Sequence, residues 1–347
     1  MDINLLFSIA AKNRASDIHL LFGHEPIFRQ EGNLLNLSEF SQDLAARKIS
    51  KADLEIFLKT ILTKEQKELF LKNKDLDIAY QIGDYRFRVN IFLERENIAI
   101  AARVISDEKP TLDEIGMPNL IKDLLEKKQG FILITGPTGC GKSTTLAAMI
   151  NYINSNRKVN IITFEDPIEF IFKSDKSIIS QRQLGIDMNS FASGLKHVLR
   201  QDPNVIMLGE MRDLETISTA ITLAETGHLV LATLHTYSAA QTIDRIIDTF
   251  PPHQQNQIRS QLSGNLTAII SQRLLAGING GRVAAREVLL NNSAVANLIR
   301  EGKIAQIKSI IETNSSIGMI TLDKHIKSLY QEGKISEETA RTNLDSE

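Results

Sequence analysis

Alternation of hydrophobic and polar residues in the first hundred positions predicts a small β-sheet. Stretches with a period of two residues, typical of half-buried strands, occur at 17–22, 77–82, 85–92 and 98–105. Each stretch places apolar side chains on one face and polar side chains on the other. This pattern favours an antiparallel sheet with one solvated face.

Helical periodicity appears twice in the same part of the chain. Residues 5–13 predict a short helix, and residues 52–71 form one long amphipathic segment in which Leu54, Phe57 and others recur at helical spacing. Helices and sheet together predict a small α+β domain over residues 1–105.

Residues 106–118 have the composition of a linker. The sequence SDEKPTLDEIGMP combines two prolines, a glycine and several charges. Within it, Thr111 and Glu114 have the spacing of a capping box that would begin a short helix.

Beyond residue 129 the pattern changes to alternating apolar strands and amphipathic helices. Strands are expected at 130–135, 160–165, 205–210 and 229–234, and helices at 142–153, 189–200 and 213–225. Such alternation predicts a parallel sheet covered on both faces, an α/β domain that we assign to residues 119–347. From about 250 to 347 we expect mostly helix, with one strand-like piece at 282–290.

Composition narrows the possible partners. The net charge is −2, aromatic residues make up 5% and tryptophan is absent, which argues against a nucleic-acid-binding surface. A single cysteine excludes an intramolecular disulfide and a multi-cysteine zinc site. No apolar run approaches the ~20 residues that span a bilayer, and the N-terminus makes a poor signal peptide. We therefore expect a cytoplasmic protein with no direct membrane insertion.

The strongest chemical signal is the sequence GPTGCGKST at 136–144, which fits the phosphate-binding P-loop pattern. It follows an apolar strand and opens a helix, as its mechanism requires. Lys142 is expected to reach the β- and γ-phosphates of ATP, and Ser143 to ligate Mg²⁺. The expected nucleotide-binding residues are Gly136, Pro137, Thr138, Gly139, Cys140, Gly141, Lys142, Ser143 and Thr144.

Acidic residues end two of the predicted strands. Glu210 follows an apolar strand and is a candidate for polarising the attacking water, with a solvated strand-end acid as the alternative. Glu165, Asp166 and Glu169 form a second group, which would repel a triphosphate unless Mg²⁺ or a chain of water molecules lay between them. We associate Asp166 with Mg²⁺ and Glu165 with catalysis, although a solvated loop is the commoner meaning of paired acids.

Two histidines bracket the strand in TGHLVLATLHT, residues 226–236. His228 and His235 would lie roughly 23 Å apart at ~3.3 Å per residue and point to opposite faces, so they cannot share a metal. His235 falls at the same sheet edge as the P-loop, and we expect it to contact the γ-phosphate or the attacking water. His228 falls at the far edge, where a structural or interface role is expected.

Cys140 lies inside the P-loop, where a helix N-terminus can lower the pKa of a thiol. That position raises the possibility of redox regulation. The alternative, which we favour, is that a small side chain is tolerated because the loop works through its backbone.

Taken together, the motifs resemble the secretion ATPases, and within them the PilT-type retraction ATPases of type IV pili. In chain order the matching segments are SDIHL, RFRVN, GPTGCGKSTT, EDPIE, LRQDPNVIMLGEMRD, TGHLVLATLHT, SQRLL and GRVAAREVL. The resemblance covers about residues 15 to 345. It extends to AVANLIREGKIAQIKS at 294–309, which is similar to the retraction signature helix but has Ala296 where the usual form has arginine.

The resemblance implies an ATP-hydrolysing homohexamer that retracts pili and drives twitching motility. Each subunit would join a PAS-like N-terminal domain to a RecA-like ATPase domain with a helical C-terminal region, with the nucleotide between the two. Arg88 and Arg103 would reach the phosphates, unless they are ordinary surface charges. The ring would act at the inner face of the cytoplasmic membrane on an inner-membrane platform protein.

The main alternative is a pilus extension or type II secretion assembly ATPase, which shares the core. Those motors usually carry a tetracysteine zinc motif and a longer N-terminal extension, and this chain has one cysteine. A nucleic-acid translocase is less favoured because the net charge is −2 and tryptophan is absent. A non-hydrolysing scaffold is less favoured because the chain retains Lys142 and Glu210.

Overall fold

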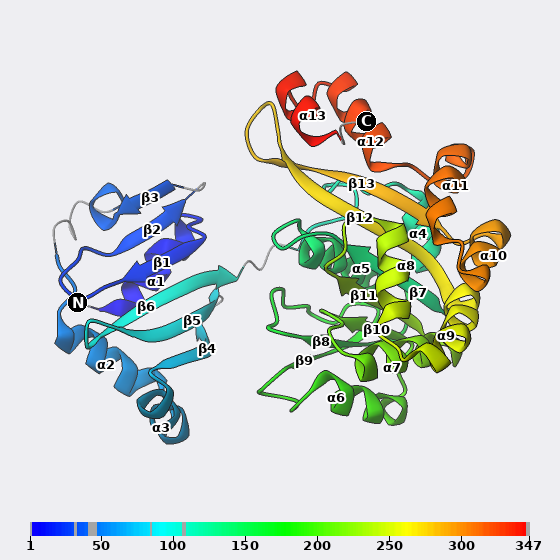
Figure 1. Ribbon diagram of the computed structural model, residues 1–347. Helices are drawn as coiled ribbons and strands as arrows, with labels where there is room; N and C mark the ends of the chain where they lie inside the picture. Colours follow the sequence, from blue (N-terminus) through cyan, green and yellow to red (C-terminus); the bar gives the residue numbers. More distant parts are fainter. Residues whose placement is uncertain (1, 31–32, 41–46, 84, 106–108, 345–347) are drawn as a thin grey trace. The chain divides into compact units, whose positions relative to one another are not determined.

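The computed structural model contains two compact units, residues 1–108 and 109–347, and each is considered by itself (Figure 1). The structure describes residues 2–30, 33–40, 47–83, 85–105 and 109–344. Within the expected linker, residues 106–108 lie outside the described residues, whereas Leu112 and Met117 are buried in the core of the second unit.

A six-stranded antiparallel sheet forms the centre of the first unit, in the order β3-β2-β1-β6-β5-β4. Its strands are β1 (Asp17–Leu20), β2 (Ile27–Gln30), β3 (Asn33–Asn36), β4 (Asp75–Ile82), β5 (Tyr85–Glu94) and β6 (Asn97–Ile105). Inward residues such as Phe28 and Phe87 are fully buried, while the alternate positions are polar. The sheet therefore has one face in the core, as the alternating pattern predicted.

Helices cover that inner face, which agrees with the α+β, PAS-like domain expected. They are α1 (Ile3–Lys12), α2 (Lys51–Ile61), α3 (Lys64–Asn73) and the short 3-10 helix η1 (Leu37–Glu39).

The single amphipathic segment expected over 52–71 is in fact two helices. Thr63 begins α3 with a reciprocal cap, accepting a hydrogen bond from Gln66 N at 3.2 Å and donating its own N–H to Gln66 Oε1 at 3.0 Å. Thr63 adopts extended backbone geometry, and this breaks the helix even though the apolar spacing continues.

The second unit is built on a seven-stranded sheet in the order β13-β12-β7-β11-β10-β8-β9. Its strands are β7 (Gly130–Thr135), β8 (Asn160–Glu165), β9 (Ile178–Gln183), β10 (Val205–Leu208), β11 (Leu229–Leu234), β12 (Leu266–Ala276) and β13 (Arg282–Leu290). All neighbours pair in parallel except β12 and β13, which are antiparallel. The predicted parallel sheet is confirmed, with an antiparallel strand added at one edge.

Helices pack on both faces of this sheet and around its antiparallel edge, and two large cores lie on opposite faces (Figure 1). The α-helices are α4 (Leu120–Leu125), α5 (Lys142–Asn156), α6 (Phe191–Val198), α7 (Leu214–Glu225), α8 (Ala239–Asp248), α9 (Pro252–Asn265), α10 (Ser293–Glu301), α11 (Ile307–Thr313), α12 (Leu322–Gln331) and α13 (Glu337–Asn343). Three 3-10 helices are η3 (Leu199–Gln201), η4 (Ile304–Gln306) and η5 (Ser315–Ile317). Coverage of a parallel sheet on both faces agrees with the expected RecA-like domain. No helix in the described part of the chain is long and apolar enough to cross a bilayer.

The expectation of one strand beyond residue 250 was wrong. Strand β12 occupies 266–276 and pairs in parallel with β7, the strand that leads into the P-loop. It follows helix α9 directly, with no loop between them, and Gly264 and Asn265 at the end of α9 are the local signal that the helix stops there. The C-terminal region therefore contributes two strands to the main sheet as well as helices.

Buried Arg286 of β13 ties the segment after residue 108 to the second unit. Its guanidinium donates to the carbonyls of Ile115 at 2.6 Å and Gly116 at 2.9 Å. The predicted capping box is present just before this point, because Thr111 N donates to Glu114 Oε2 at 2.8 Å and Glu114 N donates to Thr111 Oγ1 at 3.2 Å. The box closes a turn here, whereas the next helix, α4, begins only at residue 120.

Candidate functional site: a P-loop at the carboxyl edge of the sheet

The predicted chemical residues of the second unit gather at one edge of its parallel sheet. Strands β7, β11, β10 and β8 are neighbours in that order. The P-loop follows β7, His235 follows β11, Glu210 comes two residues after β10, and Glu165 ends β8. Because the carboxyl ends of parallel strands share an edge, these segments meet in space.

The P-loop, residues 136–141, connects β7 to α5. Gly136, Gly139 and Gly141 have φ angles of +143°, +78° and +87°, a backbone region that side-chain-bearing residues rarely adopt. Such a loop can direct N–H groups toward an anion at the N-terminus of α5. The residues expected to bind nucleotide are all found in this loop or in the first turn of α5: Gly136, Pro137, Thr138, Gly139, Cys140, Gly141, Lys142, Ser143 and Thr144.

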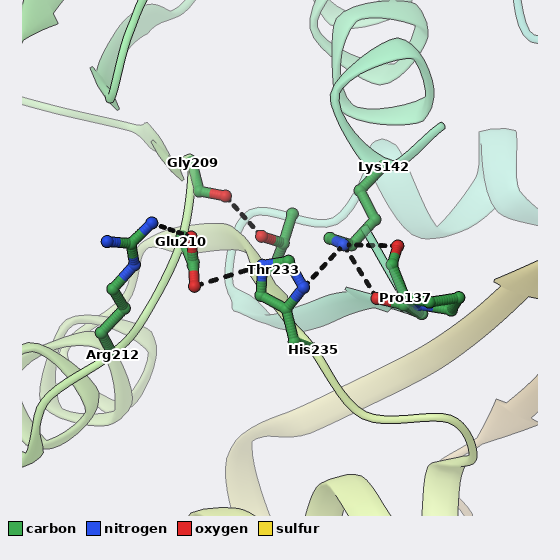
Figure 2. A network of polar contacts seen from close by, with 8 residues as sticks. Pro137, Lys142, Gly209, Glu210, Arg212, Thr233 and His235 are labelled. Atoms are coloured by element: carbon green, nitrogen blue, oxygen red, sulfur yellow. Dashed lines mark hydrogen bonds and ion pairs between the residues drawn. The ribbon is translucent and has the colours of Figure 1, made fainter. Parts of the chain in front are cut away.

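The ammonium group of Lys142 is held against the start of the loop. Its Nζ donates to the carbonyl of Gly136 at 2.8 Å and to that of Pro137 at 3.1 Å (Figure 2). Burial lowers the pKa of Lys142, and the negative charges of Glu210 and Glu169 oppose that shift. Lys142 is thus a positive charge whose neighbours at the sheet edge are acidic.

His235 connects Lys142 to Glu210, the acid that follows β10. Its Nδ1 lies 3.3 Å from Lys142 Nζ, and its Nε2 lies 3.2 Å from Glu210 Oε1 (Figure 2). A neutral imidazole with its proton on Nε2 satisfies both contacts, since it accepts from the ammonium and donates to the carboxylate. The three side chains form a continuous polar line from the P-loop to β10.

Glu210 has a second partner in Arg212, whose Nη2 lies 2.8 Å from Glu210 Oε2. Partial burial raises the pKa of the Glu210 carboxyl, but the hydrogen bond from Arg212 and the nearby His235 outweigh burial and hold the pKa below its ordinary value. The hydrogen bond to Glu210, with a smaller contribution from Asp166, raises the pKa of Arg212. Glu210 is therefore an ionised carboxylate held in place on both of its oxygens.

The backbone beneath Glu210 is fastened to β11. The hydroxyl of Thr233 donates to the carbonyl of Gly209 (Figure 2). In addition, Met211 N donates to Thr233 O at 3.1 Å. Gly209 and Met211 flank Glu210 in the chain. The position of the carboxylate is thus set by the same strand that carries His235.

Glu165 lies at the same edge but faces other partners. Its Oε1 accepts from Thr163 Oγ1 at 2.6 Å and from Gln181 Nε2 at 3.0 Å. Burial raises the pKa of the Glu165 carboxyl, partly opposed by these two hydrogen bonds. The structure therefore places Glu165 in a buried network between β8 and β9.

Ser143, Asp166 and Glu169 are the candidate oxygen ligands for Mg²⁺ at this sheet edge, since Ser143 lies in the first turn of α5 and the two acids follow β8. Mg²⁺ prefers oxygen ligands and usually keeps several waters, so hydroxyl and carboxylate groups are of the kind that it binds. Among the acids, Glu169 influences both Lys142 and Glu165 electrostatically, and Asp166 influences Arg212.

His228 lies at the opposite end of β11. Its Nδ1 contacts the carbonyl of Leu223 in α7 at 2.9 Å and the hydroxyl of Thr226 at 3.3 Å. A six-residue strand separates His228 from His235. No group of three metal-ligating side chains is found among the described residues.

Arg88 and Arg103 lie next to each other on the exposed face of the first unit, at paired positions of β5 and β6. Arg88 contacts Asp77 at 3.3 Å, and Arg103 contacts Asp17 at 3.0 Å. These side chains are well exposed, so the two ion pairs add little stability and are easily exchanged for another anion.

The Cys140 thiol is buried, at 3% relative exposure. Burial raises the pKa of the thiol, and the charge of Lys142 opposes that shift only in part. A reactive thiolate would instead require surroundings that lower the pKa of the thiol.

Two residues of the site were missed from the sequence. Arg212 lies in the segment LRQDPNVIMLGEMRD, and its position two residues after Glu210 is the local signal for it. Gln272 lies in the segment SQRLL, but its hydrogen bond to the P-loop spans 132 residues of sequence. No local sequence pattern predicts such a contact.

The fold and this edge define a P-loop nucleotide-binding protein of the α/β class. The chain belongs to the Type II/IV secretion system protein family, whose pattern matches residues 1–343.

Individual relatives agree with this assignment. The chain is 43% identical to the type IV pilus retraction ATPase PilT of Pseudomonas aeruginosa, over 98% of this chain and 97% of the relative. It is also 43% identical to a twitching motility protein of Neisseria gonorrhoeae, over 97% of this chain and 90% of the relative. A crystal structure of the pilus retraction motor PilT with bound ADP superposes with a TM-score of 0.92 at 42% identity, covering 100% of this chain and 98% of that one. The resemblance to PilT-type ATPases inferred from the motifs is thereby confirmed.

Proposed function

We propose that this chain is an ATP-hydrolysing motor that powers retraction of type IV pili and so drives twitching motility. The observation that carries the proposal is the line of contacts from Lys142 through His235 to Glu210 beside a P-loop. The chain also matches the pilus retraction and twitching motility relatives along nearly their whole length, which supports the direction of work.

ATP binds with its phosphates over residues 136–141 and the N-terminus of α5. Lys142 turns from the carbonyls of Gly136 and Pro137 to the β- and γ-phosphates. Ser143 would ligate Mg²⁺ directly, and Asp166 would hold its water shell. Mg²⁺ would supply positive charge to the phosphates of the nucleotide.

Hydrolysis is assigned to the residues around Glu210. The Glu210 carboxylate orients and polarises the water whose oxygen attacks the γ-phosphorus, while the bond to the β–γ bridging oxygen breaks and ADP leaves. His235 contacts the γ-phosphate and links its presence to Glu210. Glu165 has a supporting role, because its carboxylate is engaged by Thr163 and Gln181.

Arg88 and Arg103 supply positive charge to the phosphates from the PAS-like domain. Added arginines of this kind are worth about 10³–10⁵ in rate in P-loop enzymes. Their exposure and weak ion pairs leave them available for that exchange.

The working unit is a homohexamer on the inner face of the cytoplasmic membrane, where it acts on an inner-membrane platform protein. Nucleic acid has no part in the cycle, and the chain does not insert into the membrane. Closure of the two domains on ATP and their reopening on product release provide the movement.

Deletion of the gene tests the direction of work. The expected phenotype is many surface pili that are not retracted, with loss of twitching. A gene for Glu210→Gln should restore neither retraction nor twitching, whereas the wild-type gene restores both. Cells without pili would instead indicate an extension motor, and a defect confined to protein secretion would indicate an assembly ATPase of type II secretion.

A phosphate-release assay on the purified chain tests the chemistry separately. We expect Mg²⁺-dependent ATP hydrolysis that single-stranded DNA does not stimulate. Absence of hydrolysis would support a scaffold role, and stimulation by DNA would support a translocase.

A further inference from the structure

Gln272 of strand β12 lies beneath the P-loop and makes a hydrogen bond from each end of its side-chain amide. Its Nε2 donates to the carbonyl of Cys140 at 2.8 Å, and its Oε1 accepts from Thr145 Oγ1 at 2.9 Å. Cys140 lies inside the loop and Thr145 in the first turn of α5. The side chain is 2% exposed, so neither contact competes with bulk water.

The backbone of β12 also lies tightly against the start of the loop. A Cβ atom on Gly136 would fall 2.3 Å from the carbonyl oxygen of Gln272. One residue earlier, Thr135 Oγ1 donates to Ser271 Oγ at 2.8 Å. The backbone of β12 thus lies against the loop where the loop leaves β7, and the Gln272 side chain holds the loop where it enters α5.

The contact with Cys140 sets the direction of a peptide group. A trans peptide is planar, so the carbonyl of Cys140 and the N–H of Gly141 point in opposite directions. Gly141 has a φ of +87°, and glycine passes between backbone regions at little cost, so this peptide can flip unless its carbonyl is held. With the carbonyl held toward Gln272, the Gly141 N–H is directed away from β12. No hydrogen bond from Gly141 N–H is found within the described part of the chain.

We propose that Gln272 is a positioning residue for the nucleotide site, which keeps the Gly141 N–H aimed at the β-phosphate of a nucleoside di- or triphosphate. Gln272 does not touch the phosphate itself. It acts by holding one peptide of the P-loop in the orientation that binds an anion. The inference rests on the proposed nucleotide site but not on the direction in which the motor works.

Substitution of Gln272 by methionine is the direct test. Methionine keeps the length and much of the volume of glutamine, but it cannot donate to the Cys140 carbonyl. We expect ADP to bind about tenfold more weakly, the size of one lost hydrogen bond, measured by calorimetry. The KM for ATP should rise by a similar factor with kcat changed much less, because the Gly141 contact is made in both the ground state and the transition state.

Ser271→Ala is the matched control. It removes one buried hydrogen bond between β12 and β7 without touching the P-loop carbonyl. Its thermal stability should fall, while its affinity for ADP stays at the wild-type value. Equal ADP affinity in Q272M and S271A would overturn the inference and leave Gln272 a structural residue only.

Thr145 provides a second route if Q272M does not fold. Thr145→Val removes the hydroxyl that holds the far end of the Gln272 amide, and Thr145→Ser restores it. We expect ADP affinity about two- to threefold weaker in T145V and unchanged in T145S, which is a fraction of one hydrogen bond. Identical affinities in the two variants would contradict the inference. Failure of wild-type protein to bind ADP would instead contradict the proposed function.

Discussion

The imidazole of His235 lies 3.3 Å from the ammonium nitrogen of Lys142, so the P-loop lysine is in direct contact with the residue that follows β11, the strand beside β7 in the sheet. The other ring nitrogen reaches Glu210 at 3.2 Å. Movement of Lys142 toward a phosphate therefore changes the surroundings of the residue assigned to the attacking water. In the mechanism proposed above, His235 would link nucleotide binding to hydrolysis, because it contacts both Lys142 and Glu210.

Replacement of His235 by alanine should lower ATP turnover by about a hundredfold, comparable to loss of one preorganised polar contact in a transition state. ADP affinity should remain within a few-fold of wild type, because the phosphate-binding backbone is unchanged. Phosphate release and calorimetry measure the two effects. His228→Ala, at the other end of β11, is the control and should retain turnover. Equal turnover in the two variants would remove His235 from the mechanism.

Arg88→Ala and Arg103→Ala should each keep ATP binding and lose about a thousandfold in turnover, in line with the contribution of added arginines in P-loop enzymes. Thermal stability should change little, since both ion pairs are exposed. Arg86→Ala offers a matched control, because Arg86 lies two residues before Arg88 on the same face of β5. A similar loss in all three variants would point to a general effect of charge on the sheet.

Gly136→Ala should abolish nucleotide binding and destabilise the ATPase domain. The new Cβ would lie 2.3 Å from Gln272 O and 2.6 Å from Cys140 Sγ, at a φ of +143°. Gly139→Ala is a milder comparison, because it meets nothing within 4 Å and suffers only the backbone strain of its φ of +78°, about 1–3 kcal/mol. In thermal melting and in ADP binding, G136A should show the larger loss and G139A the smaller one. If G136A bound ADP as tightly as G139A does, β12 would have to shift to make room for the new Cβ.

Cys140 should react slowly with iodoacetamide at pH 7 in the folded protein. Its thiol is buried and burial raises its pKa, so little thiolate is present or accessible. Mass spectrometry of protein treated with and without guanidinium measures the difference. Rapid labelling of the folded protein would revive a redox role for the loop.

Stability should fall with acid in a way that depends on His325. Burial lowers the pKa of His325, and its Nδ1 accepts the backbone N–H of Arg286 at 2.8 Å. Below pH 6.5 the unfolded chain takes up a proton before the folded chain does, so the stabilisation present above pH 6.5 is lost as pH falls through the folded pKa. Melting temperatures between pH 7.5 and 5 should decline more for wild type than for His325→Gln, which keeps an acceptor but does not titrate. Parallel decline in both proteins would assign the acid sensitivity to other groups.

The chemical edge of the sheet was predictable because its signals are local. A strand, a glycine-rich loop and a helix follow each other within 130–156, and Glu210 and His235 each come at the end of an apolar run. Because the strands are parallel, their carboxyl ends lie at the same edge of the sheet, and no knowledge of individual contacts is needed to predict this. Contacts among Lys142, His235 and Glu210 follow from this geometry.

Strand β12 was not predictable in the same way. The run LTAIISQRLLA follows α9 with no loop between them, and although Gly264 and Asn265 mark the end of the helix, a short apolar run can form either a strand or a helix. Pairing with β7, which is more than 130 residues away, decides the outcome. The contact of Gln272 with the P-loop depends on that pairing, so it could not be inferred before the sheet was known.

The carbonyls that hold Lys142 set a limit on how tightly nucleotide can bind. Lys142 donates to Gly136 and Pro137, so a phosphate gains the ammonium group only as the loop gives it up. Binding is an exchange of hydrogen bonds, and its net free energy is the difference between two similar terms. A motor must release its product in every catalytic cycle. Because the carbonyls of Gly136 and Pro137 can accept Lys142 Nζ again, this exchange favours the release of ADP.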